Sequence, residues 1–339
     1  MNDTEGTFAG PLTVAVTGPT GEIGKPFVRA LESTPEVGRV LAMARRPFDP
    51  AELGWQKTEY RQGDILDRAA VDALVADADV VVHLAFIVVQ ATTESFDINV
   101  DGSRNVFEAA AAAGIPRLVY TSSVAAYGYH GDVPGPLTED MPARGTEGHP
   151  YSHQKAEVER VLSEALAGSA TDAYVFRPCI VAGPESPALL EMLPYVRYEE
   201  KVPAAVRDAL GRVPGVKPVL PDHGIPFQLV HHDDVATALV AAVLGRGTPG
   251  VYNLAAEDEV TISDIARELG WHAVPIPRQA IDVGANLLAR IPATAVEAGW
   301  LEALRTPMLM DCRRARRELG WEPRYDGRQT LHDLASLRG

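Results

Sequence analysis

The sequence is poor in the features that mark secreted and nucleic-acid-binding proteins. Only two of its 339 residues are cysteines, Cys179 and Cys312, too few for a disulfide framework and wrongly spaced for a zinc site. Basic residues are outnumbered, with 31 against 46 acidic ones. The formal net charge of −15 therefore argues against a nucleic-acid partner and against an anionic membrane surface.

Long apolar runs are also missing. The most apolar stretch, Val80–Ala91, is shorter than the roughly 20 residues of a spanning helix, and it contains His83. The first ten residues lack the basic and apolar regions of a signal peptide. Together with the scarcity of cysteine, these absences predict a cytoplasmic protein without a membrane partner.

The composition is that of a folded chain, 46% hydrophobic and 23% charged. Short apolar strands, expected at 12–17, 40–44, 79–84, 117–122 and 173–177, alternate with helices at 25–31, 69–75, 99–113 and 151–167. This alternation indicates βαβ units and a parallel sheet that is covered on both faces. The alternation breaks after Pro178; a further strand is expected at 251–254, and helices at 262–269, 311–319 and 331–337.

A glycine-rich turn follows the first expected strand. The segment GPTGEIG leads from that strand into a helix, and the residues expected at a bound phosphate are Gly18, Thr20, Gly21, Glu22, Ile23 and Gly24. One glycine permits the tight turn, one lets the backbone approach a pyrophosphate, and one lets the helix pack on the strand. The alternative is an ordinary glycine-rich βα turn; the position after the first strand favours a dinucleotide site.

The sequence therefore predicts a Rossmann-type α/β fold, a doubly wound parallel sheet with a smaller mixed C-terminal substrate lobe. Residues 11–180, with a return segment at 224–256, are expected to form the dinucleotide-binding domain. Residues 181–223 and 257–339 are expected to form the small substrate-binding lobe.

The second expected strand ends in Ala44, and Arg45 and Arg46 follow it. NAD enzymes place a carboxylate at this position to hold the ribose hydroxyls, whereas an arginine accommodates a 2′-phosphate. Two arginines without a carboxylate favour NADP over NAD as the cofactor, unless both are simply solvated surface charges.

Tyr151 and Lys155 lie one helical turn apart, on one face of an expected helix. An ammonium close to a phenol favours the phenolate, as a tyrosine acting as an acid and base requires. Thr121 and Ser123 stand at the carboxyl end of the strand 117–122, where open α/β sheets bind their ligands. Alone, a YxxxK pattern equally fits a half-buried tyrosine beside a solvated lysine.

In this combination the chain resembles the extended short-chain dehydrogenases/reductases of the NAD-dependent epimerase/dehydratase family. The matching segments, in the family's order, are TGPTGEIG, GDILD, DVVVHLA, NVDGSRNV, YTSSVAAYG, YSHQK, FRPCIVAGP, HHDDVA and RRELGW. They extend over nearly the whole chain.

The resemblance implies a role for each matching position. Ser123 holds the substrate oxygen, Tyr151 is the acid and base, and Lys155 binds the nicotinamide ribose and tunes Tyr151. The cofactor contacts include Asp64 and Ile65 at the adenine, Leu84 and Ala85 along a strand, Asn99, Thr121, and Pro178 beside the nicotinamide. The family also implies a homodimer, formed through the helices of Asn99 and Tyr151.

Two positions depart from the family's sugar-nucleotide enzymes. Dehydratases carry an acidic residue after the catalytic serine, where this chain has Val124, so dehydration is disfavoured. Nucleotide-sugar epimerases place an arginine where this chain has Phe227. The charge of a nucleotide sugar would then have to be met from elsewhere, for which the candidates are Arg197, Arg207, Arg212 and Arg305.

Residues 86–89, which follow the HLA segment, are apolar. Either they line the substrate pocket, beginning with Phe86, or they pack in the core. The expected reaction is hydride transfer at a carbinol or ketone carbon of a small molecule, by a nucleotide-sugar epimerase or a ketone reductase. A non-catalytic dinucleotide sensor or scaffold is the alternative. His130 and His149 are weaker candidates for a second proton donor. No metal is expected at His231 and His232, because adjacent residues of an extended segment point to opposite faces.

Overall fold

The computed structural model describes residues 10–88, 93–132, 135–193, 196, 217–277 and 306–338. The chain divides into two compact units. The first comprises Met1–Cys179, Asp233–Leu254 and Met310–Glu322, and the second comprises Ile180–His232, Ala255–Leu309 and Pro323–Gly339. Two segments differ from the expected division: Met310–Glu322, expected in the smaller lobe, belongs to the unit that carries the large sheet, and residues 224–232, expected in the dinucleotide-binding domain, belong to the second unit.

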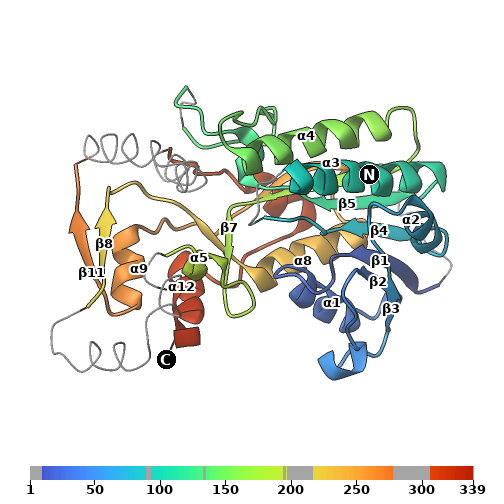
Figure 1. Ribbon diagram of the computed structural model, residues 1–339, viewed down its shortest axis with the longest axis horizontal. Helices are drawn as coiled ribbons and strands as arrows, with labels where there is room; N and C mark the ends of the chain where they lie inside the picture. Colours follow the sequence, from blue (N-terminus) through green and yellow to red (C-terminus); the bar gives the residue numbers. More distant parts are fainter. Residues whose placement is uncertain are drawn as a thin grey trace. The chain divides into compact units, whose positions relative to one another are not determined.

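The first unit is built on a seven-stranded sheet in which all neighbouring strands are parallel (Figure 1). Its order is β10-β6-β5-β4-β1-β2-β3. The strands are β1 (Leu12–Thr17), β2 (Val37–Ala44), β3 (Thr58–Gln62), β4 (Val80–His83), β5 (Arg117–Thr121), β6 (Asp172–Pro178) and β10 (Gly250–Leu254). The chain reverses its direction of growth between β1 and β4, which is the switch point where such sheets bind ligands.

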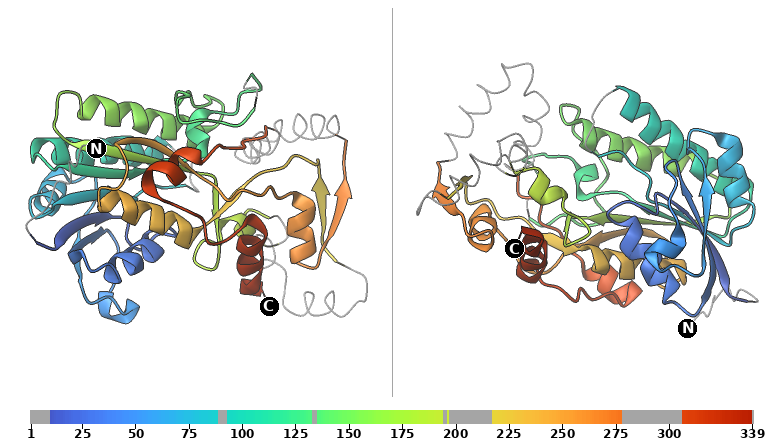
Figure 2. Two further views of the ribbon diagram at one scale, coloured as in Figure 1. Left: turned by 180° about the vertical axis from the view of Figure 1, so that it is seen from behind. Right: turned by 60° about the horizontal axis from the view of Figure 1, so that its bottom comes forward.

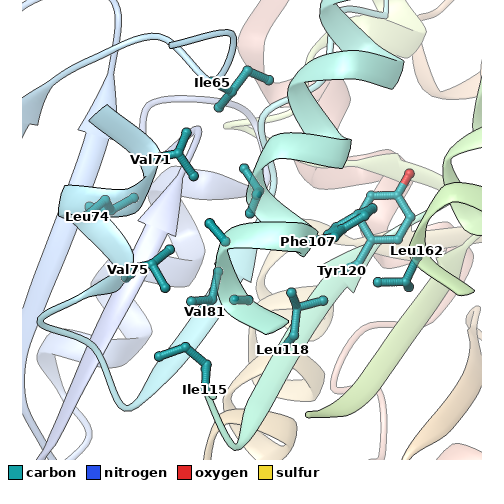
Figure 3. Packing of buried hydrophobic residues seen from close by; sticks show 14 of the residues in the cluster. Ile65, Val71, Leu74, Val75, Val81, Phe107, Ile115, Leu118, Tyr120 and Leu162 are labelled. Atoms are coloured by element: carbon teal, nitrogen blue, oxygen red, sulfur yellow. The ribbon is translucent and has the colours of Figure 1, made fainter. Parts of the chain in front are cut away.

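Helices cover both faces of this sheet, as predicted. Helices α2 (Arg68–Val75), α3 (Thr93–Ala112) and α4 (Pro150–Ala165) lie on one face, and α1 (Gly24–Glu32) and α8 (His232–Val243) lie on the other (Figures 1 and 2). Val81 and Leu118 of the sheet pack with Phe107 of α3 and Leu162 of α4 in a buried cluster (Figure 3). The apolar faces of the helices meet continuous apolar strands there.

Some local predictions differ from the structure; the last helix, for example, was expected at 331–337 and spans Gly327–Ala335. Strand β3 was not expected, because its sequence TEYRQ is polar and sits at the edge of the sheet. Helix α3 begins at Thr93, six residues before the expected start at Asn99. The helix expected from Asp311 begins at Arg313 and becomes a π-helix over Ala315–Leu319; the Asp311 carboxylate accepts the Arg313 N–H at 2.9 Å.

The second unit has two small parallel sheets. One pairs β8 (Val219–Asp222) with β11 (His272–Pro275), and the other pairs β7 (Ile180–Ala182) with β9 (Leu229–His231). Helices α5 (Ala188–Glu191), α9 (Ile262–Glu268) and α12 (Gly327–Ala335) belong to the same unit. Leu229, Val260, Ile265 and Leu334 are among the residues of its buried core.

Short 3₁₀ helices complete the described elements, η1 (Pro50–Leu53) and η2 (Val124–Tyr127) in the first unit and η5 (Ser336–Arg338) in the second. Among the helices that the structure describes, none is both long and apolar enough to cross a bilayer. Helices α3 and α4, through which we expect the homodimer to form, lie side by side (Figure 1). The dimer stays a prediction, and the mass of the protein in solution tests it.

Candidate functional site

In the glycine turn between β1 and α1, backbone atoms approach two of the glycines too closely for a side chain. Gly18 has φ of +73°, and a Cβ added there would lie 2.7 Å from the backbone nitrogen of Ala85. A Cβ on Gly24 would lie 2.2 Å from the carbonyl oxygen of Gly18. Gly21 differs, because a Cβ there would meet only that same oxygen at an ordinary 3.5 Å. Two glycines are therefore required by the fold itself, whereas Gly21 is exposed and no close contact demands a glycine there.

The other predicted residues of the turn lie at the start of α1. Thr20 is exposed, and Glu22 and Ile23 are half-buried. The first backbone N–H groups of α1 are thereby presented beside an open glycine, which is a cradle that fits a pyrophosphate. The turn is joined to β2, because the Gly18 N–H donates to the carbonyl of Met43 at 3.2 Å.

The carboxyl end of β2 carries the two arginines of the cofactor prediction. Arg45 and Arg46 are both exposed. The Arg45 guanidinium lies 3.9 Å from the Asp64 carboxylate, with both side chains more than a third exposed. Ile65 is buried, with its side chain close to Gly102 of α3, whereas its neighbour Asp64 is half-buried.

A buried polar chain fixes the end of β4. The hydroxyl of Thr17 and Nδ1 of His83 are 2.7 Å apart, and Nε2 of His83 lies 2.9 Å from the hydroxyl of Ser103. Burial lowers the pKa of His83 to about 3, which keeps the imidazole neutral. The chain ties β1, β4 and α3 together at the point where Leu84 and Ala85 leave the sheet, both half-buried.

Asn99 holds the segment that follows Ala85. Its side-chain oxygen accepts the N–H of Ile87 at 2.8 Å, and its amide nitrogen donates to the carbonyl of Ile87 at 3.0 Å. The same nitrogen donates to the side chain of Gln154 on α4 at 2.8 Å. Asn99 is fully buried and engaged on both amide atoms, so it positions the chain at the site.

Ser123 and Tyr151 come together at the carboxyl end of β5. Ser123 caps η2, accepting the N–H of Ala125 at 3.2 Å, and its side chain is hydrogen-bonded to that of Tyr151. Burial raises the pKa of the Tyr151 phenol, and the bond to Ser123 opposes that rise. The two side chains that the YxxxK motif and the strand end suggested are thus in direct contact.

Lys155 is buried one turn further along α4. Its Nζ donates to the backbone carbonyl of Thr121 at 3.0 Å and lies 3.6 Å from the centroid of the Phe86 ring. Burial lowers the pKa of Lys155 to about 7. The hydroxyl of Thr121 is buried and has no hydrogen-bond partner within the described part of the chain, which leaves a polar group for a ligand to satisfy.

Phe86, a predicted substrate residue, contacts both Tyr151 and Lys155 of the YxxxK motif. Its ring meets that of Tyr151 edge-on with centroids 5.7 Å apart, and it also faces the Lys155 ammonium. Ile87 is half-buried and Val88 is 44% exposed. The side chain that packs against the phenol ring is therefore apolar. Val89 lies outside the described residues.

A buried ion pair below Lys155 was not foreseen. The carboxylate of Glu159 accepts from the guanidinium of Arg177 on β6 at 2.5 and 2.9 Å, and from the hydroxyl of Ser122 at 2.5 Å. The spacing of Glu159, four residues after Lys155, was a signal available in the sequence. Its partner Arg177 is 18 residues away in the chain, and only the packing of α4 on β6 brings them together.

The remaining predicted residues have local roles. His149 caps α4, its Nδ1 accepting the N–H of Ser152 at 3.2 Å, and His130 is 2.8 Å from the carbonyl of Gly145. Pro178 is buried at the end of β6. Phe227 belongs to the second unit, where it pairs with Val260. Four arginines considered as charge donors, Arg197, Arg207, Arg212 and Arg305, lie outside the described residues.

The side chains of His231 and His232 lie together, so the geometric reason for expecting no metal there was wrong. We expected the two side chains to point to opposite faces, but their ring centroids are 4.2 Å apart, because the chain turns from β9 into α8 between them. Both imidazoles have protein partners: His231 stacks on Tyr325 with centroids 3.9 Å apart, and Nε2 of His232 accepts the N–H of Glu185 at 3.2 Å.

The fold and these motifs define the class of protein, and comparison with known proteins agrees. The model of the "NAD dependent epimerase/dehydratase family" matches residues 14–255, and the chain belongs to this family. It is 27% identical over 327 residues to an uncharacterized protein of Sinorhizobium fredii, covering 94% of this chain and 76% of that one. It is 30% identical over 327 residues to the ceramide reductase of Caulobacter vibrioides, covering 91% and 86%.

A solved structure has the same fold. It is that of the Bordetella bronchiseptica enzyme WbmH in complex with NAD⁺, with a TM-score of 0.70 and 20% identity, covering 97% of this chain and 99% of that one. This likeness extends over both units of the present chain and confirms the predicted fold class.

Proposed function

We propose that this protein catalyses NAD(P)-dependent hydride transfer at a carbinol or ketone carbon of a small molecule, with ketone reduction as the working direction. The observation that carries the proposal is the contact between Ser123 and Tyr151 beside the buried Lys155. A sensor that only binds a dinucleotide has no need of a phenol held in this way.

The chain's own residues support each part of the reaction. Ser123 donates a hydrogen bond to the substrate oxygen, and Tyr151 gives its proton to that oxygen as the carbonyl is reduced. The bound nicotinamide supplies the hydride. Lys155 places a positive charge beside the phenol, which stabilises the phenolate that remains, and the protein regains a proton from solvent afterwards.

The glycine turn and the two exposed arginines support the cofactor. Gly21 leaves the backbone open to a pyrophosphate at the N-terminus of α1, and the unpartnered hydroxyl of Thr121 lies at the same edge of the sheet. Arg45 and Arg46 at the end of β2 favour the 2′-phosphate of NADP, although the WbmH structure contains NAD⁺.

Two observations favour a reductase that acts on an apolar ketone. The ring of Phe86 packs against that of Tyr151, and the two residues that follow Phe86, Ile87 and Val88, have apolar side chains that offer no hydrogen bonds to a sugar. Val124, which follows Ser123, is buried and supplies no second acid or base, so dehydration is not supported. The similarity to a protein named ceramide reductase also supports reduction of a lipid-like substrate.

Cofactor consumption tests the proposal. A reductase oxidises one NADPH for each ketone reduced, whereas an epimerase recycles a tightly bound cofactor without a net change in absorbance. The substrate panel should pair long-chain and polycyclic ketones with nucleotide sugars. Cofactor binding without turnover on any member of the panel would instead support the sensor or scaffold.

The Tyr151→Phe variant should lose at least about 10²-fold in kcat with unchanged cofactor affinity. Tyr174→Phe is the matched control, because the hydroxyl of Tyr174 donates to the Gly247 carbonyl, away from the carboxyl ends of the strands. Near-normal turnover of Tyr151→Phe would remove this phenol from its proposed role.

A further inference from the structure

Glu159 carries a charge into the layer between α4 and the sheet. Tyr151, Lys155 and Glu159 follow one another at intervals of four residues, so they lie along one face of α4. The side chain of Glu159 is 10% exposed and that of Arg177 is 3% exposed. A pair buried to this extent is costly to desolvate and needs a full set of hydrogen bonds to persist.

The side-chain donors to this carboxylate, among the residues that the structure describes, come from β6 and from the end of β5. Arg177 donates from β6, and Ser122 donates from the residue between Thr121 and Ser123. Arg177 is held in turn by the carbonyl of Met141 at 3.1 Å, and its guanidinium lies 4.3 Å from the centroid of the Tyr127 ring. The pair thus ties α4 and β6 to the strand end that carries Ser123.

We propose that Glu159 and Arg177 are a positioning pair with opposed electrical effects: Glu159 keeps Lys155 charged, and Arg177 limits how strongly it does so. The proposal rests on the proposed function, because it takes Lys155 and Ser123 as working residues.

Among the residues that the structure describes, Glu159 is the counter-charge of Lys155, as the groups around this amine indicate. They are His83 on β4, Tyr120 on β5, and Tyr151 and Glu159 on α4. His83 is neutral, and burial raises the pKa of both phenols. The carboxylate of Glu159 opposes the lowering of the Lys155 pKa that burial causes, and Arg177 is the cation that faces this carboxylate from β6.

The proposal is testable because removing Glu159 and removing Arg177 should shift the titration of Lys155 in opposite directions. Glu159→Gln removes the negative charge, so Lys155 should lose its proton at lower pH; Arg177→Gln leaves that charge uncompensated, so Lys155 should lose its proton at higher pH. A merely structural role would loosen the site in both variants and shift both titrations in the same direction. The expected shifts are about one pH unit in each direction.

The chain allows the titration to be read directly. It has only five lysines, Lys25, Lys57, Lys155, Lys201 and Lys217, so ¹³Cε-lysine labelling yields five signals, and Lys155→Met assigns the one of interest. Glu157→Gln is the matched control, because it breaks an exposed pair with Arg160 on the same helix and should leave the Lys155 signal unchanged. The alkaline limb of the reductase pH profile should move in the same directions.

Breaking a buried pair can prevent folding, so two more variants complete the design. Arg177→Lys keeps the charge, so Lys155 should titrate in this variant as it does in the wild type. The double variant Glu159→Gln/Arg177→Gln removes both charges. It should lower the titration midpoint of Lys155 by less than Glu159→Gln alone does. Shifts of one sign in the two single variants, or no shift, would overturn the proposal. Opposite NMR shifts without turnover on any substrate would contradict the proposed reaction and support the pair.

Discussion

The ammonium of Lys155 lies 3.6 Å from the centroid of the Phe86 ring. The contact brings the segment after β4 against α4, and it places an aromatic face where the amine meets little water. A cation over an aromatic face is stabilised when both are desolvated, which offsets part of the cost of burying the amine. The same ring packs edge-on against Tyr151, so one apolar side chain organises both residues of the motif.

Burial of Lys155 should cost stability. Its pKa is lowered from 10.5 to about 7, so between these values the unfolded chain binds a proton that the folded chain does not. The free energy of unfolding of the wild type therefore rises with pH across this window. Lys155→Met should be more stable by about 2 kcal/mol at pH 7, and the difference should shrink toward pH 10. Urea unfolding at several pH values measures this difference in the free energy of unfolding. Lys217→Met, at an exposed site, should show the same pH dependence as the wild type.

His83 should make the protein sensitive to acid. Its pKa falls from 6.5 to about 3 on folding, so between these values the unfolded chain binds the extra proton. Stability should be lost as pH falls through this window, by up to about 1.4 kcal/mol per pH unit more than in His83→Gln. His272→Gln, at an exposed imidazole, serves as the control for urea unfolding between pH 7 and 4. Parallel slopes for wild type and His83→Gln would contradict a neutral buried imidazole.

Substitutions at Gly24 and Gly21 should affect stability and cofactor binding to different extents. Gly24→Ala forces a Cβ against the Gly18 carbonyl, so it should lower the free energy of unfolding by about 1–3 kcal/mol and also weaken cofactor binding. Gly21→Ala meets no such clash and should change stability by less than about 1 kcal/mol. It should nevertheless weaken cofactor binding at least about tenfold, because the added Cβ stands where the pyrophosphate approaches. Calorimetric titration with NADPH and thermal unfolding report the two effects; unchanged affinity in Gly21→Ala would argue against the cradle.

Arg45 and Arg46 should decide between the two dinucleotides. Replacing both by alanine should weaken NADPH by about 10-fold or more and leave NADH nearly unchanged, because only NADPH carries the 2′-phosphate. Arg39→Ala, whose partner Glu59 lies on β3, is the control on the same strand β2. Clearly tighter binding of NADH than of NADPH by the wild type would refute the preference itself.

The glycine turn, the strand–helix alternation and the YxxxK pair could be predicted because each is local. The turn depends on φ at Gly18 and on spacing, and the pair depends on the periodicity of one helix. Strand β3 was missed for a physical reason as well, since an edge strand with exposed faces has no apolar run to reveal it.

Contacts between distant segments decided the rest. Asn99 braces Ile87 and Glu159 meets Arg177, each because of how the elements pack in space. The sequence by itself determined the family and the sheet, and it indicated Ser123, Tyr151 and Lys155 as the candidate site residues, because short-range spacing encodes these features. Only the tertiary structure decided the charge environment of Lys155, because burial and a counter-charge depend on which strands and helices surround the amine.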